Sequence, residues 1–355
     1  MKTRVKFLCK ILSFLLVFIL ISGSFGCSSK GSAVDFYYFK TQIHVQSESK
    51  KISDKTANKI DNILRLLDQT FSASQPNSFT CSFNSSKVGN VDANEHVIKV
   101  LTACKDLYTI TEKTFNPAVK PLIDLWQFDK YPVANFTPPS DLLIEQVLSS
   151  NALDFDKIVI DEENQTVYKP IDDMQIDLGG IAKGYATDLI YQILIDDGYE
   201  DGYVNVGGSS LCLVSEPALS VAHPRKDGSI IKVKTIGQTG LFVSTSGDYQ
   251  RYYEFNGVRY SHLIDGLTGA PADTGIISAT ITGASGIILD ALSTALCVVP
   301  YENGELNALI DKILFNYPNA KIYLVYQKDD VKQIITNASE IDVAVIDTEY
   351  QLVLI

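Results

Sequence analysis

The sequence "MQIDLGGIAKGYATDLIYQILIDDGY", residues 174–199, predicts the central unit of the fold. A short strand is expected to end at Asp177, Gly179-Gly180 to form a turn, and a helix to begin near Ile181 and end before Gly198. Four apolar side chains then recur at i, i+4 spacing on the helix face expected to point into the core: Ile181, Tyr185, Leu189 and Ile193.

The same stretch places two glycines and Lys183 at the start of a helix. Backbone N–H groups at a helix N-terminus favour anions such as phosphate, and adjacent glycines allow a ligand to approach the main chain closely. A strand-to-helix turn without a ligand has the same pattern, so both interpretations stay open on these residues alone.

Patterns elsewhere predict a mixed α+β domain. Residues 57–71 and 91–111 have apolar side chains at helical spacing, residues 36–45 read as one strand, and residues 113–128 as a loop with an aromatic wall. No linker, repeat or low-complexity run follows the N-terminal segment. The fold class expected is α+β, with mixed sheets packed against helices in a single large domain over residues 35–355.

The N-terminal segment predicts export. Basic residues precede the apolar run of residues 11–21, which is shorter than the roughly 20 residues of a membrane span, so residues 1–26 read as a signal peptide. Gly26-Cys27 resembles the lipobox of bacterial lipoproteins, which predicts acylation of Cys27, a tether over residues 27–34 and a protein anchored outside the cytoplasmic membrane. Ordinary secretion is the alternative.

Composition limits the partners. The formal net charge of −12 disfavours nucleic acid as a partner, and an excess of carboxylates suits divalent cations. The cysteines of the expected domain lack the spacing of a zinc site, so buried free thiols are expected: Cys81, Cys104, Cys212 and Cys297.

Two carboxyl-terminal features carry chemistry. In "SGIILDALSTALCVV", residues 285–299, Asp290 and Thr294 are one helical turn apart and offer hard oxygen ligands suited to Mg²⁺. A helix whose aspartate interacts with the dipole and whose threonine bonds to the main chain explains the pair equally.

The second feature is a hairpin around Asn256-Gly257, which brings residues 245–247 and Ser261-His262 to the same end. His262 is a candidate base, although a lone strand histidine is often structural. A further pair in "YVNVGGSS", residues 203–210, ends a strand and exposes amides and two hydroxyls, as a simple bend also would.

The order of these motifs resembles the ApbE family: "TFNPAVKPLIDLWQF", "IDLGGIAKGYATD", "VNVGG", "STSGDYQRYYEFNGVRYSHLIDGLTGAP" and "DALSTAL" follow one another from about residue 36 onward. The resemblance implies a mixed domain called a T-fold that takes FAD as substrate with one or two Mg²⁺ ions. It also implies transfer of the FMN half of FAD to a threonine or serine hydroxyl of an exported acceptor protein, with release of AMP.

The resemblance assigns roles by position. His262 matches the general base. Metal ligands are implied at Gly180, through its carbonyl, and at Asp290 and Thr294. The FAD contacts implied are Phe39, which stands where many members have methionine, Thr114, Phe115, Asn116, Asp177, Lys183 and Ser261.

This sequence departs from the family pattern at Ser209, where many members have an acidic residue, and at Gly266, where proline is usual. The first departure could weaken the metal site or the ribose contacts, and the second is expected to loosen the turn beside His262. Two alternatives therefore accompany the transferase: an FAD pyrophosphatase that uses water, and a non-catalytic FAD-binding lipoprotein.

Overall fold

The computed structural model describes residues 31–215, 219–234, 239–301 and 304–355, so the predicted signal peptide and Cys27 lie outside the described residues. A nine-stranded sheet forms its centre, antiparallel throughout except for the parallel pair β15–β17. In spatial order its strands are β1 (Ser32–Tyr38), β2 (Thr41–Ser47), β6 (Tyr203–Val206), β7 (Ser210–Leu213), β10 (Leu241–Gly247), β13 (Ile276–Gly283), β14 (Lys321–Lys328), β15 (Val331–Thr336) and β17 (Gln351–Leu354).

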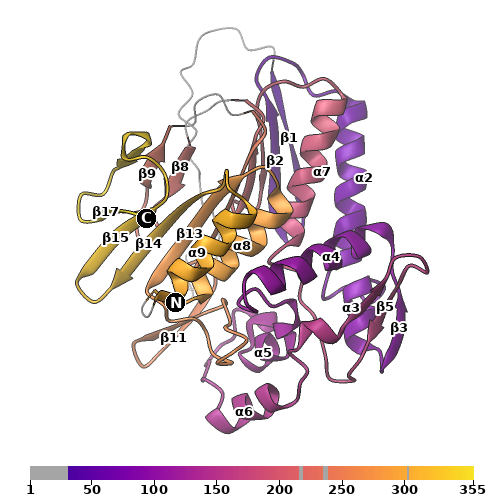
Figure 1. Cartoon of the computed structure of the whole chain (residues 1–355). Coiled ribbons are helices and arrows are strands. Elements are labelled where there is room, and N and C mark those ends of the chain that lie inside the picture. The colour runs from indigo at the N-terminus through magenta and orange to yellow at the C-terminus, as the bar shows by residue number, and fades with distance from the viewer. Residues whose placement is uncertain (1–30, 216–218, 235–238, 302–303) are drawn as a thin grey trace, which may run out of the picture.

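Smaller elements surround this sheet (Figure 1). Three further sheets are β16 (Val343–Val345), β9 (Ser229–Val233) and β8 (Leu219–Ala222); β3 (Gly89–Asp92), β5 (Thr166–Lys169) and β4 (Val159–Asp161); and the hairpin β11 (Tyr252–Phe255) with β12 (Val258–Ser261). The described α-helices are α2 (Asp54–Phe71), α3 (Phe79–Ser85), α4 (Glu95–Ile110), α5 (Lys120–Leu125), α6 (Asp141–Ser149), α7 (Ala182–Asp196), α8 (Gly286–Val298) and α9 (Glu305–Asn316). Short 3₁₀ turns are η2 (Pro117–Val119), η3 (Phe128–Lys130), η4 (Phe155–Lys157) and η6 (Glu340–Asp342).

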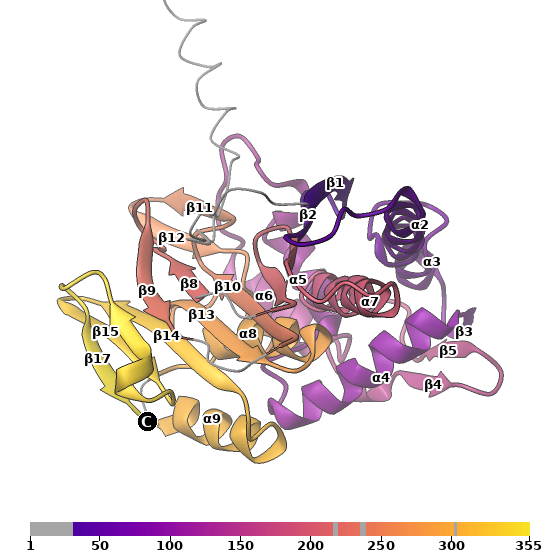
Figure 2. The same cartoon turned by 90° about the horizontal axis from the view of Figure 1, so that it is seen from above.

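Both faces of the central strands are buried because their side chains alternate between two cores. In β10, Phe242 packs into the core shared with α2, α4, α7, α8 and α9, whereas Val243 packs into the core shared with β8, β9 and β16. Figure 2 shows α8 beside β10 and β13 on one side, with β8 and β9 on the other side of these strands. The result is three layers, and the predicted mixed class of a single domain is confirmed.

Several local predictions are confirmed. The helix predicted over residues 57–71 is the larger part of α2, and α7 begins within one residue of Ile181. Gly198 adopts a φ of 73° and ends α7 with a bond from the Tyr199 N–H to the Leu194 carbonyl, which is a Schellman cap. All four cysteines of the domain are free thiols, three of them buried. Such local patterns are sufficient because helix periodicity and capping depend on neighbours in sequence.

Three predictions were wrong in detail. Residues 36–45 form a hairpin instead of one strand, because Phe39 and Lys40 turn the chain with φ of 52° and 58°. The helix predicted from residue 91 begins only at Glu95, after the Asn94 cap, because Val91 belongs to β3. β1 begins at Ser32, so it includes residues that were assigned to the tether.

Two other segments also differ from expectation. No strand precedes Asp177, because its N–H donates to the Pro117 carbonyl instead of to a neighbouring strand. The loop predicted over residues 113–128 instead contains η2 and α5, since prolines are tolerated in the first turn of a helix. Its aromatic wall is confirmed by Trp126, which is buried against Phe136 and Tyr260.

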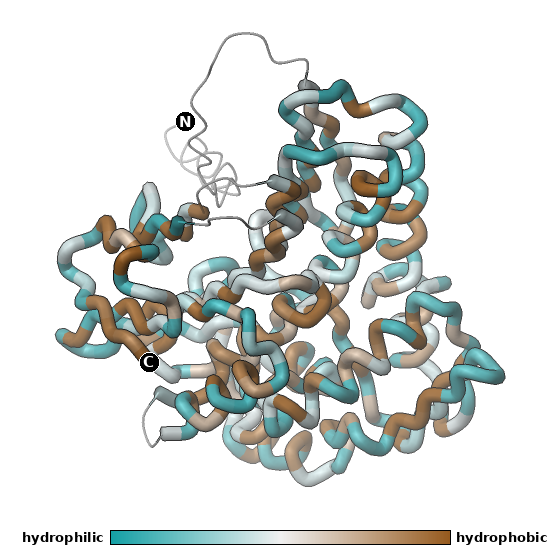
Figure 3. The backbone as a smooth tube through the Cα atoms, turned by 45° about the horizontal axis from the view of Figure 1, so that its top comes forward, coloured by the Kyte–Doolittle hydropathy of each residue, from teal (hydrophilic) through white to brown (hydrophobic). Residues whose placement is uncertain are grey.

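The hydropathy of the backbone follows these layers. Figure 3 shows hydrophobic stretches along the inner strands and packed helix faces, with hydrophilic stretches concentrated in the outer loops. None of the helices in the described ranges combines the length and apolar character that crossing a bilayer requires.

One buried cation gives a stability prediction. The fully buried Lys169 ammonium donates to the carbonyls of Phe83, Asn84 and Ser86 at 3.0, 3.2 and 2.9 Å, at the end of α3. We expect Lys169→Met to lower the free energy of unfolding by about 2–3 kcal/mol, because three buried acceptors lose their donor. Urea denaturation measures it, and Lys87→Met, which removes an exposed ammonium nearby, is the control. Equal effects of the two substitutions would contradict this account.

Candidate active site

The glycine turn before α7 presents a cation beside a carboxylate. Lys183 lies in the first turn of α7, and its ammonium donates to the Gly179 carbonyl at 2.6 Å. The same nitrogen lies 3.6 Å from Oδ2 of Asp290, which comes from α8. Two segments about a hundred residues apart in sequence therefore meet, a contact that neither motif predicts on its own.

Asp290 is buried at the contact between α7 and α8. The residue is 2% exposed, and its Oδ2 accepts a hydrogen bond from the Gly184 N–H at 3.0 Å. Thr294 lies one turn further along α8, on the same face, and its hydroxyl lies 3.3 Å from the Asp290 carbonyl and 3.2 Å from the Ser246 hydroxyl. The predicted pairing of Asp290 and Thr294 on one helix face is present.

Gly180 faces both Thr294 and the predicted flavin loop. A Cβ atom added at Gly180 would lie 3.5 Å from Oγ1 of Thr294 and 3.6 Å from the ring of Phe115. The Asp177 N–H donates to the Pro117 carbonyl at 2.8 Å, which ties the loop of residues 114–117 to the glycine turn. Three predicted motifs thus converge on Gly180.

The loop residues themselves are held by internal bonds. The Thr114 hydroxyl donates to the Thr111 carbonyl at 2.7 Å, and the Asn116 amide donates to the Leu153 carbonyl at 2.9 Å. Oδ1 of Asn116 also accepts from the Ala118 N–H, so this side chain is used by the fold. Gly266 packs against Asn116, since an added Cβ would lie 3.1 Å from its nitrogen.

The turn after His262 is held firmly, contrary to the expectation that Gly266 loosens it. Asp265 accepts bonds from the Leu267 N–H and the Thr268 hydroxyl, both at 2.8 Å. The Trp126 indole N–H donates to the Gly269 carbonyl at 2.8 Å, which anchors the turn to the aromatic wall.

His262 follows β12 and is oriented by the main chain. The hairpin with Asn256-Gly257 at its tip is confirmed, with Ser261 paired to Tyr252. The Arg251 carbonyl accepts from the His262 N–H at 3.0 Å and lies 3.2 Å from Nδ1. A carbonyl has no proton to give, so Nδ1 is the donor and Nε2 is the basic nitrogen of the neutral ring.

The surroundings of His262 keep it neutral. Burial, followed by the positive charge of Arg251, lowers its pKa to about 4, with a further contribution from Lys183. The influence of Lys183 shows that the ring lies within electrostatic reach of the α7 N-terminus. At neutral pH the imidazole ring is therefore unprotonated.

Ser261 and Phe39 have different relations to the site. Ser261 is buried, and its hydroxyl has no hydrogen-bond partner within the described ranges. Phe39 lies in the β1–β2 turn, where its N–H donates to Asp68 at 2.9 Å. In the described part of the chain no hydrogen bond or ring contact joins Phe39 to the other predicted site residues.

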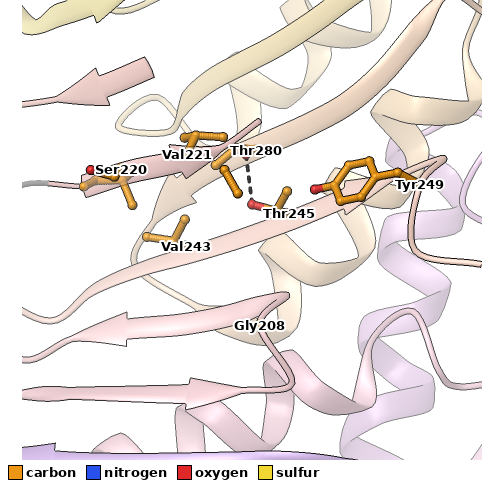
Figure 4. Close-up of a pocket in the computed structure, with 9 residues that line it drawn as sticks. Gly208, Ser220, Val221, Val243, Thr245, Tyr249 and Thr280 are labelled. Atoms are coloured by element: carbon orange, nitrogen blue, oxygen red, sulfur yellow. Dashed lines mark hydrogen bonds between the residues drawn. The ribbon is translucent and has the colours of Figure 1, made fainter. Parts of the chain in front are cut away.

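The second glycine pair forms the β6–β7 turn, with φ of 65° at Gly207 and 73° at Gly208. The expectation that it exposes two hydroxyls was wrong, because Ser209 and Ser210 are buried. Near this turn a small pocket opens on the β8 side of the sheet, where Tyr249 and Thr245 lie close together and Thr245 bonds to Thr280 at 2.9 Å (Figure 4). None of the predicted site residues lines this pocket.

Sequence reasoning missed three supporting residues. Ser246 and Ser293 join their hydroxyls at 2.9 Å behind Thr294. Asp188, at the end of the "GYATD" motif, accepts bonds from the start of α8. All three lie inside stretches that were singled out, but their partners are far away in sequence.

The residues present fit a magnesium ion chemically. Carboxylate, hydroxyl and main-chain carbonyl oxygens are the hard ligands that Mg²⁺ prefers, and Asp290, Thr294 and Gly180 supply one of each. No group of three or more His, Cys, Asp or Glu side chains is arranged around a metal position in the described ranges, and this ligand set, with its single carboxylate, does not need one.

Comparison with known proteins places this chain in a family. The model of the ApbE family matches residues 39–312. The FAD:protein FMN transferase of Haemophilus influenzae is 29% identical over 290 residues, which cover 78% of this chain and 80% of that protein. The enzyme of the same name from Escherichia coli K12 is 28% identical over 264 residues, covering 72% and 74%.

Solved structures agree with this assignment. The ApbE protein of Thermotoga maritima superposes with a TM-score of 0.72 at 28% identity and covers 83% of this chain and 94% of its own. The flavin transferase ApbE of Vibrio cholerae shares the fold with a TM-score of 0.74 at 21% identity, covering 88% and 98%. Since the family model matches well over half of its length, the chain belongs to the ApbE family.

Proposed function

We infer the activity of this chain from its family and its site: it is a FAD:protein FMN transferase. Beyond that, we propose that it requires Mg²⁺, that the acceptor is a threonine or serine hydroxyl, and that AMP is released. The observation that carries this proposal is the convergence of Gly180, Lys183, Asp290 and Thr294 at the contact of α7 with α8.

The proposed reaction is a substitution at phosphorus. The acceptor oxygen forms a bond to the phosphorus on the riboflavin side of FAD, and the bond from that phosphorus to the AMP phosphate oxygen breaks. The hydroxyl proton passes to Nε2 of His262, and AMP leaves with the electron pair. Neutral His262 suits this role, because a general base must be unprotonated when the hydroxyl attacks.

The remaining residues bind and orient FAD in this proposal. Lys183, next to the N–H groups at the start of α7, offers positive charge to the pyrophosphate. Asp177 and the loop of residues 114–116 lie at the same turn, since the Asp177 N–H donates to the Pro117 carbonyl. Together with the Ser261 hydroxyl they would contact the rest of FAD. Phe39 is proposed as a flavin or adenine contact on the resemblance alone.

Asp290, Thr294 and the Gly180 carbonyl would hold the metal. When bound, Mg²⁺ supplies charge neutralisation on the non-bridging phosphate oxygens. Asp290 and Thr294 are already ordered by bonds to Gly184 and Ser246, so the chain presents this oxygen set in a fixed arrangement.

Transfer itself is the test. The protein is mixed with FAD, Mg²⁺ and a flavin-accepting domain, and covalent flavin fluorescence, added FMN mass and AMP are measured. Transfer that a chelator abolishes is the expected result. AMP release without an acceptor would instead identify an FAD pyrophosphatase, and bound FAD without AMP would identify a flavin carrier.

We also propose, from the sequence of residues 1–27, that the chain is exported and anchored by a lipid on Cys27, which would place it beside exported acceptors. Mass spectrometry of the N-terminal peptide from membrane-extracted protein tests this. An unmodified Cys27 in the mature protein would contradict it.

A further inference from the structure

Helices α7 and α8 touch through their backbones at one point, next to the site. A Cβ added at Gly184 would lie 2.1 Å from the Gly286 carbonyl oxygen, and one added at Gly286 would lie 2.5 Å from the Gly184 carbonyl oxygen. Only glycine fits at either position, since a real Cβ never approaches a backbone oxygen so closely. The close approach brings the carboxylates of each helix to the backbone of the other.

Two carboxylates join the helices in opposite directions. Asp290 of α8 accepts from the Gly184 N–H of α7 at 3.0 Å. Asp188 of α7 accepts from the N–H groups of Gly286 and Ile287, the latter at 2.9 Å, and lies 3.3 Å from the Ser285 hydroxyl.

Asp188 takes over the capping of α8. Ser285 occupies the N-cap position, yet its side chain makes no capping bond. The first N–H groups of a helix need an acceptor, and here a carboxylate from a neighbouring helix provides it. Burial raises the pKa of Asp188 to about 6, although the hydrogen bonds from Ile287 and Gly286 lower it in part. The carboxylate is therefore largely charged at neutral pH, where it faces the positive end of the α8 helix dipole.

We propose that Asp188 is the positioning residue of the metal site: by joining the start of α8 to α7, it sets the place of Asp290 relative to Gly180 and Lys183. This inference rests on the proposed function, because only that proposal makes Asp290 a metal ligand. Asp188 itself is absent from the predicted ligand set. Partners that orient a ligand from outside the coordination shell typically change metal affinity about 10–100-fold when replaced.

The proposal can be tested without an activity assay by titrating the full chain with Mn²⁺ alone. The electron paramagnetic resonance signal of the free ion measures how much Mn²⁺ is bound. We expect Asp188→Asn to weaken Mn²⁺ binding by about tenfold or more, since an amide keeps one acceptor but turns an N–H toward the helix start. The matched control is Asp197→Asn, which weakens the bonds of the α7 end to Thr56 and Lys59, far from α8. It should lower stability but leave Mn²⁺ affinity unchanged.

A second variant separates positioning from simple stabilisation. Asp188→Asn combined with Ser285→Asp places a capping carboxylate on α8 itself, which should restore thermal stability. If Asp188 positions Asp290, Mn²⁺ affinity stays weak because the link to α7 is still missing. Wild-type affinity in the single variant, or in the stable double variant, would overturn the inference. Failure of the wild-type chain to bind Mn²⁺ would overturn the metal proposal as well, so the two failures are distinguishable.

Discussion

Asp290→Asn is expected to reduce FMN transfer by about 10³-fold or more at any Mg²⁺ concentration that the enzyme tolerates. Asp290 is the single carboxylate among the three proposed ligands, and it is buried, so its charge is poorly screened by water. Asparagine retains the size of the side chain and an oxygen able to accept from Gly184, which preserves the α7–α8 contact. The loss therefore reports on charge and metal binding, not on folding.

The measurement is the initial transfer rate with saturating FAD while Mg²⁺ is varied, together with the thermal midpoint of each variant. Asp311→Asn, an exposed aspartate on α9, is the control and should behave as the wild type. A variant that keeps its fold and transfers FMN at the wild-type rate would remove Asp290 from the metal site. If the variant loses FAD binding as well as transfer, part of the role of Asp290 is to orient Lys183, whose Nζ lies 3.6 Å from Oδ2 of Asp290.

The parts of this fold that sequence predicts are those fixed by near neighbours. The spacing of Asp290 and Thr294 is a property of one helix, so their shared face follows from α-helix geometry. The hairpin turn is likewise predictable, because Asn256 and Gly257 readily adopt the positive φ angles that such a turn needs, here 51° and 78°.

Predictions failed where distant partners decide the structure. Phe39 and Lys40 turn the chain without glycine or asparagine, and the Phe39 N–H is satisfied by Asp68 on α2. The segment before Asp177 is not a strand, because Asn84 and Pro117 take its backbone bonds. None of these three partners is visible from the local pattern.

The same limit applies to the site. Each motif had a plausible structural explanation alone, and only the fold brings Lys183 to Asp290 and Gly180 to Phe115. Asp188 shows this most clearly, since its bonds to Gly286 and Ile287 span about a hundred residues, and nothing in "GYATD" indicates them. The family resemblance proposed the metal ligands, whereas the residues that hold those ligands in place, such as Asp188, could be found only from the structure.

His262→Gln is expected to lower the transfer rate constant by about 10²–10⁴-fold while FAD still binds, because a positioned base contributes that much to proton transfer. The ring is oriented by the Arg251 carbonyl through Nδ1, so Nε2 is free to accept the hydroxyl proton. Single-turnover transfer and FAD titration separate the two effects. An unchanged rate constant would show that another group, or water, removes the proton.

The pH dependence gives an independent test of the same role. With a pKa of about 4, His262 stays unprotonated as pH falls from 7 to 5, so the acid limb of kcat/KM that it causes should lie near pH 4 instead of 6.5. Folding lowers this pKa from 6.5 to about 4, so the unfolded chain takes up a proton at His262 before the folded chain does. The contribution of His262 to the free energy of unfolding is therefore lost as pH falls from about 6.5 to about 4.

Arg251→Met identifies that limb. The substitution removes a positive charge that helps to depress the pKa but keeps the main-chain carbonyl that orients the ring, so the limb belonging to His262 should move toward higher pH. A limb that does not move belongs to another group, such as Asp188 with its pKa of about 6. Profiles of the wild type and Arg251→Met that coincide throughout would mean that proton uptake by His262 does not limit transfer, and the base would have to be sought elsewhere around Lys183.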